Sequence, residues 1–285
     1  MAEWTQWKES AELPFRASLN ASTLFPYRLG IEEQIRTAAE AGYEGIEIWM
    51  KDLEAYAAEG GSVSALRRLA SDLGIEIANA ISFIPWADAD ESVRARGREQ
   101  ADAELSLLAE LGCPAFAAPP FGDVAEVSLE EMGRRFAELE AQARRYGVAP
   151  ILEFWGRAKK LSRLGEAIEV AKLSGLANVP LLLDPFHLYT GGSDLGDLAR
   201  LRGEDIGIVH ANDYPANPPR ETIADADRLF PGDGIAPSAE LAKALKACGY
   251  RGFLSLELFM DDYGGRSALE TARYGLAKMR SAYAV

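Results

Sequence analysis

Four polar side chains interrupt apolar runs in the second half of the sequence, each where a run ends. Glu153 ends PILE, Asp184 ends PLLLD, His210 ends IGIVH and Glu257 ends FLSLE. A buried carboxylate costs on the order of several kcal/mol unless a cation or hydrogen bonds compensate for it, so three converging carboxylates would repel one another. We therefore expect one divalent metal ion, bound by all four side chains. This mostly hard ligand set suits Mn²⁺, Mg²⁺ or Co²⁺ and can also hold Zn²⁺, so the identity of the metal stays open.

The elements that position these residues follow from a repeat. An amphipathic helical segment that ends near glycine is followed again and again by a short apolar run, as in AAEAGYEGIEIW and AKLSGLANVPLLLD. The glycine suits a left-handed helix cap, and runs rich in Val, Ile and Leu are typical of buried parallel strands. The repeat predicts strands near 15–22, 45–49, 75–81, 114–118, 149–154, 180–184, 206–210 and 253–258.

Eight parallel strands that alternate with helices predict a single (β/α)₈ TIM barrel, an α/β fold in which catalytic residues gather at the carboxyl ends of the strands. A doubly wound open sheet is less consistent with the sequence, because LNASTLFP after the first strand is not a glycine-rich dinucleotide turn. We expect one domain over residues 1–285, with residues 1–14 as an N-terminal extension. The long irregular stretch 213–234 is a candidate active-site loop.

Further side chains near the strand ends have two readings. Arg228, in the long loop, would stabilise negative charge on a substrate oxygen or form a surface ion pair with a neighbouring aspartate. Aromatic residues after three strands would wall a pocket for a sugar ring or pack in the core; they are Trp49, Phe83, Trp86 and Trp155. The basic cluster Arg157, Lys159 and Lys160 is read as a solvated helix start, because no glycine-rich phosphate cradle accompanies it.

Composition excludes several classes of partner. A formal charge of −14 and the lack of a dense basic stripe disfavour nucleic acid. The N-terminal stretch has no basic region followed by an apolar run, and no segment approaches membrane-spanning length, so we expect a soluble, cytoplasmic protein. The two cysteines, Cys113 and Cys248, are too few for a disulfide framework and are read as free thiols.

The motifs LEFWG, LLLDPFHLYTGGS, IVHANDYP, DRLFPGDG and FLSLELF occur in this order at barrel spacing. In this combination the chain resembles the xylose isomerase-like superfamily of sugar isomerases and epimerases, and within it the inosose (2-keto-myo-inositol) isomerases. The likeness extends from Asn20 to Glu257. Departures from the pattern are Trp49, where relatives often carry a charged residue, and Arg157 after Trp155.

The resemblance implies a function and residue roles. Vicinal oxygens of a keto-sugar or keto-inositol would chelate the metal, and proton transfer would pass through a metal-bound enediolate. Glu153 and Glu257 match the acid/base pair as well as two metal ligands. His187, Arg228, Trp155 and Asn20 are the expected substrate-binding residues.

Several alternatives stay open within the resemblance. The same intermediate would expel a leaving group in a lyase, either an inosose-type dehydratase or the subunit of an enzyme that cleaves carbon-linked glycosides with a small partner subunit. A homo-oligomer is also open. Metal-dependent endonucleases of the superfamily need many histidines and a cationic face, whereas this chain has two histidines. A non-catalytic barrel is disfavoured because every ligand position is filled.

Overall fold

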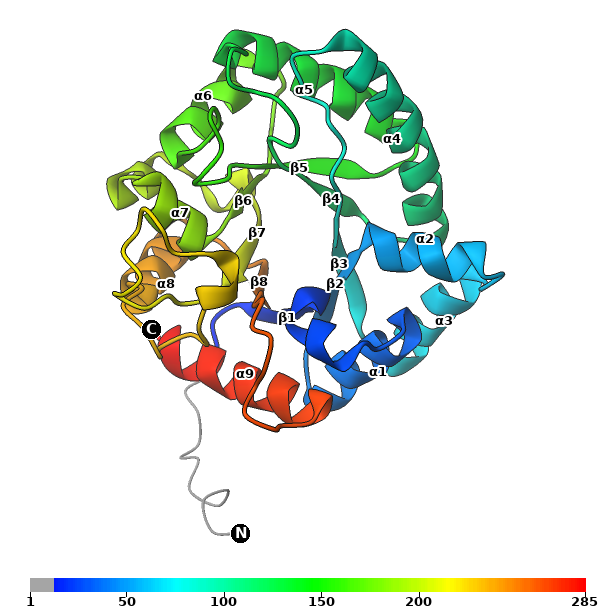
Figure 1. Cartoon of the computed structure of the whole chain (residues 1–285), viewed down its shortest axis with the longest axis vertical. Coiled ribbons are helices and arrows are strands. Elements are labelled where there is room, and N and C mark those ends of the chain that lie inside the picture. The colour runs from blue at the N-terminus through cyan, green and yellow to red at the C-terminus, as the bar shows by residue number, and fades with distance from the viewer. Residues whose placement is uncertain (1–12) are drawn as a thin grey trace.

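The protein folds as a closed eight-stranded parallel barrel with helices between the strands, as the repeat predicts. The computed structural model describes residues 13–285. Figure 1 looks along the barrel, with the strands forming an inner ring and the helices an outer one. The strands are β1 (Arg16–Asn20), β2 (Gly45–Trp49), β3 (Glu76–Ile81), β4 (Ala115–Ala118), β5 (Ala149–Glu153), β6 (Leu181–Leu183), β7 (Ile206–Ala211) and β8 (Phe253–Leu256).

Nine α-helices surround the strands in the described part of the chain. They are α1 (Ile31–Ala41), α2 (Met50–Ala58), α3 (Val63–Leu73), α4 (Glu91–Leu111), α5 (Leu129–Arg144), α6 (Leu164–Leu173), α7 (Pro185–Gly191), α8 (Ser238–Ala247) and α9 (Ala268–Ala282). Short 3-10 helices are η1 (Ala21–Tyr27), η2 (Leu195–Arg200), η3 (Gly203–Asp205) and η4 (Asp225–Asp227). The glycine caps are confirmed at Gly42 and Gly74, with φ of 94° and 67°.

The predicted strands are confirmed, but β1, β5, β6 and β8 end one or two residues earlier than expected, and at two of these ends a polar side chain caps the next element. Asn20 ends β1 by accepting a hydrogen bond from the Ser22 amide at the start of η1. Asp184 ends β6 in the same way, because it caps α7. β8 stops at Leu256, so Glu257 lies one residue past the strand.

Two apolar layers hold the barrel. The larger core lies between strands and helices, and a smaller one fills the barrel interior with Ile81, Ala115, Ala117, Ile151, Leu182 and Ile208. At the amino-terminal end, the ring of Phe253 plugs the interior beside Gly45, where an added Cβ would lie 2.6 Å from the ring. Arg16 covers that ring at 4.1 Å and pairs with Glu76. These side chains cover the amino-terminal end of the interior, opposite the carboxyl ends of the strands, where catalytic residues gather in such barrels.

Candidate active site

Three of the four expected metal ligands come together at the carboxyl end of the barrel. Asp184, His210 and Glu257 follow or end the neighbouring strands β6, β7 and β8 and are almost fully buried. One donor atom from each lies within 4.8 Å of the other two. His210 Nδ1 is 3.2 Å from Asp184 Oδ2 and 3.0 Å from Glu257 Oε2. These three residues form what we call the ligand cluster, and its two carboxylates and one imidazole could hold a divalent cation.

Local structure fixes the orientation of Asp184. Its Oδ1 accepts hydrogen bonds from the amides of Phe186 and His187, and Asn212 Nδ2 donates to the same oxygen. Pro185 occupies the first turn of α7, where its lack of an amide proton costs nothing. Oδ1 is thus occupied by the fold, and Oδ2 is the oxygen that faces His210.

Arg228 is buried inside the site and is not a surface residue. Its Nη1 lies 2.7 Å from both Asp184 Oδ2 and Glu257 Oε2. Its Nε and Nη2 donate hydrogen bonds to Asp225 Oδ1. Burial alone would raise the pKa of Asp184, but the charges of Arg228, His187 and His210 outweigh burial and lower it well below its usual range. The Asp225 partner was one of the two sequence-based readings; the contacts to two cluster carboxylates were not foreseen.

A residue that the sequence analysis missed, Glu47 on β2, contacts His210 from inside the barrel. Glu47 Oε1 lies 3.2 Å from His210 Nε2, and Asn79 donates to its other oxygen at 2.8 Å. Burial would lower the pKa of His210, but Glu257, Glu47 and Asp184 raise it well above its usual value. A sequence signal did exist, because Glu47 interrupts the apolar run GIEIW just as the recognised carboxylates interrupt theirs.

Asn20, expected to bind substrate, lies behind the ligand cluster and is not among the described residues that line the cavity. Its Nδ2 donates to Glu257 Oε1 at 3.1 Å and to Glu47 Oε1 at 3.3 Å. Its Oδ1 accepts from Trp49 Nε1 at 2.9 Å. Every polar atom of the side chain is therefore committed, and its position favours orienting Glu257 over contacting a substrate.

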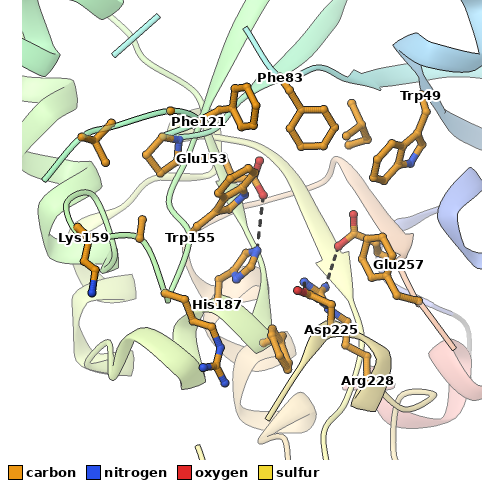
Figure 2. A pocket seen from close by; sticks show the side chains of 18 of the residues that line it. Trp49, Phe83, Phe121, Glu153, Trp155, Lys159, His187, Asp225, Arg228 and Glu257 are labelled. Carbon is orange, nitrogen blue, oxygen red and sulfur yellow. Dashed lines mark hydrogen bonds and ion pairs between the residues drawn. The ribbon is translucent and has the colours of Figure 1, made fainter. Parts of the chain in front are cut away.

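Glu153 and His187 face each other on the other side of the opening, outside the ligand cluster. Glu153 Oε1 lies 3.9 Å from His187 Nε2 (Figure 2). Burial raises the pKa of Glu153 to about 8, with the nearby carboxylates adding to the effect against the charge of His210. Burial lowers the pKa of His187 to about 4. The pair is a protonated carboxyl beside a neutral imidazole near pH 7, a combination suited to proton transfer.

The opening at the carboxyl ends of the strands leads into a cavity of about 770 Å³. Glu153, His187, Arg228 and Glu257 line it together with aromatic side chains that include Trp49, Phe83 and Trp155 (Figure 2). Trp86, the fourth aromatic residue singled out from the sequence, is buried against Phe136 and donates to the Pro119 carbonyl. Arg157 is no free cation: its guanidinium donates to backbone carbonyls of residues 220, 221 and 223.

Comparisons with known proteins identify the family of this chain. The family model for the xylose isomerase-like TIM barrel matches residues 35–282. The chain belongs to this family. A crystal structure of the IolI protein with a bound zinc atom superposes on this chain with a TM-score of 0.85 and 25% sequence identity. The superposition covers 94% of this chain and 99% of the IolI chain.

Curated members of the family resemble the chain over different lengths. A 3-dehydroshikimate dehydratase from Pseudomonas aeruginosa is 33% identical over 261 residues, 87% of this chain and 39% of the relative. An inosose isomerase from Halalkalibacterium halodurans is 35% identical over 137 residues, 48% of each chain. The alignments thus span less than half the length of these two relatives. In residues 13–285, no helix is long and apolar enough to cross a membrane.

Proposed function

We propose that this family member is a divalent-metal-dependent isomerase or epimerase of a keto-sugar or keto-inositol. The observation that carries the proposal is the ligand cluster of Asp184, His210 and Glu257, whose Glu257 lines a cavity that Glu153 and His187 also line. Arg228 compensates the two buried carboxylates in the structure, and a divalent ion would share that role when bound. The likeness to inosose isomerase supports the substrate class.

The donor set fits one divalent ion. Asp184 Oδ2, His210 Nδ1 and Glu257 Oε2 would hold it. Glu153, which ends β5 outside this cluster, would supply a fourth donor. When bound, an ion such as Mn²⁺, Mg²⁺, Co²⁺ or Zn²⁺ would supply Lewis acidity to a substrate carbonyl, which would make the neighbouring carbon more acidic. Glu47 fixes the imidazole plane by facing Nε2, which directs Nδ1 toward the cavity.

Proton transfer falls to the two glutamates on opposite sides of the opening. One carboxylate removes the proton from the carbon next to the carbonyl, and the other returns a proton. Return to the former carbonyl carbon, with a hydroxyl proton moved to the carbonyl oxygen, gives the isomer; return to the original carbon on its other face gives the epimer. Glu153 is suited to this work by its position across the opening from the ligand cluster; burial raises its pKa to about 8 in the metal-free protein, and a bound cation would lower it.

Neighbouring side chains stabilise the charge that develops. His187 Nδ1 is buried and has no hydrogen-bond partner among residues 13–285, and Nε2 points toward Glu153, so the imidazole is available to bind a substrate oxygen. The Arg228 guanidinium lies beside the ligand cluster and lines the cavity, where its charge favours an anionic substrate oxygen. Trp155 and Trp49 exclude water from this end of the cavity.

The test combines metal content with exchange. The purified protein is loaded with each of the four ions, desalted and measured by inductively coupled plasma mass spectrometry, then incubated with 2-keto-myo-inositol and common ketohexoses in deuterium oxide and followed by NMR. We expect one ion per chain and deuterium incorporation next to the carbonyl, with a new keto isomer or epimer. Glu257→Gln should lose both.

The matched control is Glu104→Gln. Glu104 is also a buried carboxyl group, but it lies on α4, bonds Ser82 and Gln100, and is not among the residues that line the cavity. Its variant should keep metal and exchange. The proposal fails if wild type retains no stoichiometric ion, or if both variants lose metal equally.

A second candidate is a dehydratase that removes water from the same class of keto compound. The alignment with 3-dehydroshikimate dehydratase over 87% of this chain favours it. Here the proton leaves the carbon next to the carbonyl and hydroxide leaves the following carbon, so the product is an unsaturated ketone and one water. The same NMR assay separates the two, because only the dehydratase yields an alkene signal.

A further inference from the structure

We propose that Arg157 is a positioning residue, which holds the first half of the loop after β7 in place and thereby keeps Arg228 on the ligand cluster. Arg157 follows β5, so the contact joins two loops at the carboxyl ends of the strands. The second half of the β7 loop has ties of its own, because Asp213 accepts two backbone hydrogen bonds there. We call residues 215–224, in the first half, the held segment. The effect on turnover rests on the proposed function, whereas the positioning itself does not.

The guanidinium of Arg157 binds three backbone carbonyl oxygens of the held segment. Its Nη1 donates to the Glu221 carbonyl at 3.1 Å, and its Nη2 donates to the carbonyls of Arg220, at 3.2 Å, and Ile223. A guanidinium is planar, always charged and carries five donors at fixed angles, so it can hold several carbonyls at once. Hydrogen bonds from a charged donor are also stronger than those between neutral groups. Arg157 therefore fixes the path of the backbone, not a single side chain.

The held segment depends on these bonds. In the described part of the chain, every hydrogen bond that joins this segment to residues outside its loop comes from Arg157. Other bonds stay within the loop, such as those from the Thr222 and Ile223 amides to the Pro219 carbonyl. Ile223 adds an apolar anchor, because its buried side chain lies in one cluster with Phe186 on α7. Without Arg157, that side chain would be the main tie of the segment to the barrel.

Arg157 itself extends from a tightly packed turn. Gly156, the residue before it, lies so close to α7 that an added Cβ would be 2.6 Å from the His187 carbonyl oxygen. The turn is closed by a hydrogen bond from the Ala158 amide to the Trp155 carbonyl at 2.8 Å. Close packing of this kind leaves a backbone little room to shift. The turn after β5 is thus the fixed partner, and the loop after β7 is the one that is restrained.

The held segment ends next to the residue that orients Arg228. Asp225, one position beyond the segment, accepts hydrogen bonds from Arg228 Nε at 3.1 Å and Nη2 at 2.8 Å, and Figure 2 shows both side chains near Glu257. The Nη1 of the same guanidinium lies 2.7 Å from Asp184 Oδ2 and from Glu257 Oε2. A shift of the held segment would move Asp225 and draw Arg228 away from these carboxylates. Arg157 therefore acts on the ligand cluster through Arg228.

Hydrogen-exchange mass spectrometry measures whether the held segment opens. The amides of Ile223 and Arg228 are bonded within the loop, so they have protection to lose. We expect Arg157→Ala to speed exchange of residues 219–228 by about tenfold or more and to leave the barrel strands unchanged, because an exposed loop can open locally without global unfolding. Exchange that stays at the wild-type rate in this variant would overturn the proposal.

The matched control is Arg163→Ala. Arg163 is another exposed arginine of the loop after β5, but its Nε donates to the Gly191 carbonyl at 3.1 Å, and it is not among the residues that line the cavity. Residues 219–228 should exchange in this variant as they do in wild type. Equal acceleration in Arg157→Ala and Arg163→Ala would mean a general effect of lost charge and would contradict the role of Arg157.

A double-mutant cycle determines whether Arg157 acts through Arg228. Unfolding free energies are measured in urea for metal-free wild type, Arg157→Ala, Arg228→Met and the double variant. We expect Arg228→Met to cost about half as much or less in the Arg157→Ala background as in wild type, because the effects of residues in one network are not additive. In the Arg163→Ala background its full cost should remain. Equal costs of Arg228→Met with and without Arg157 would leave Arg157 a local structural role and overturn the proposal.

Turnover provides a third measurement and separates the two proposals. With a keto substrate that wild type converts, Arg157→Ala should lower kcat about tenfold or more and leave KM within about threefold, because the Arg228 charge matters most as charge develops on the substrate. A raised KM with unchanged kcat and unchanged loop exchange would make Arg157 a direct substrate contact and overturn its positioning role. A wild type that converts no keto compound removes the proposed reaction alone, since loop exchange and the double-mutant cycle need no substrate.

Discussion

Glu47 and His210 meet inside the barrel, with His210 Nε2 3.2 Å from Glu47 Oε1 although 163 positions separate them in the sequence. The opposite nitrogen of the same ring faces Glu257 at 3.0 Å. When a carboxylate holds one ring nitrogen of a histidine, the ring plane is fixed and the other nitrogen becomes more basic. The pair therefore prepares His210 to act as a metal ligand.

Replacing Glu47 should weaken metal binding without removing a ligand. We expect Glu47→Gln to raise the dissociation constant for Mn²⁺ or Zn²⁺ by roughly 10–100-fold, the usual effect of losing such a partner. Competition with a chelating dye measures the constant. Glu104→Gln, with its buried carboxyl group away from His210, serves as control and should bind as wild type does. Unchanged affinity in Glu47→Gln would remove its role in orienting His210.

Arg228 should matter most for stability when no divalent ion is bound. Its guanidinium lies between Asp184 and Glu257, so Arg228→Met leaves only His210 to compensate these two buried carboxylates among the contacts described. We expect a loss of about 3–5 kcal/mol in the unfolding free energy of metal-free protein. With saturating Mn²⁺ the loss should shrink, because the ion compensates the same charges. Urea unfolding with and without the ion measures both values.

Arg135→Met is the matched control for that experiment. Arg135 is another buried arginine, but it bonds backbone carbonyls and Glu131 on α5, away from the ligand cluster. Its loss of stability should be the same with and without Mn²⁺. The interpretation of Arg228 is wrong if its variant behaves like Arg135→Met.

Glu153 should make the metal-free protein less stable as pH rises. Its pKa is about 8 in the folded protein and near 4.5 when unfolded, so the folded state keeps a proton that the unfolded state has lost. Stability from this group is complete below pH 4.5 and is lost as pH rises toward 8. The difference in unfolding free energy between wild type and Glu153→Gln should therefore fall with pH, by up to about 1.4 kcal/mol per unit.

Unfolding curves at closely spaced pH values between 5 and 9 test this slope. His187 works in the opposite direction, since its pKa of about 4 gives stability that is lost as pH falls below 6.5. Subtracting the variant from wild type cancels that contribution. A difference that stays flat up to pH 8 would show that Glu153 is already ionised in the folded protein.

Asp213 should control the loop that carries Arg228. It accepts hydrogen bonds from the amides of Tyr214, Gly232 and Ala236. We expect Asp213→Ala to leave these donors unpaired, cost roughly 1–3 kcal/mol for each that stays buried, and speed hydrogen exchange at residues 228–236. Asp213→Asn keeps an acceptor oxygen and should exchange more slowly than the alanine variant. Exchange mass spectrometry measures the difference, and identical protection in all three proteins would contradict it.

The sequence by itself determined the barrel and the strand that carries each expected ligand. The repeat of helical segment, glycine cap and short apolar run predicts the strands. Burying a polar residue at the end of an apolar run is costly, so residues such as Asp184 and Glu257 indicate a site. Glu47 also interrupts an apolar run, but it lies within its strand, before the aromatic residue that ends it, so it was not predicted as a site residue.

Only the tertiary structure decided which of these residues meet. Closing the barrel brings β2 next to the site, so Glu47 faces His210, and it turns Asn20 toward Glu257, behind the cavity. The loop after β7 folds Arg228 inward onto two carboxylates, whereas its sequence neighbours indicated a surface pair as readily. Such contacts depend on ring closure and loop path, which join residues far apart in the chain, and local patterns carry no information about them.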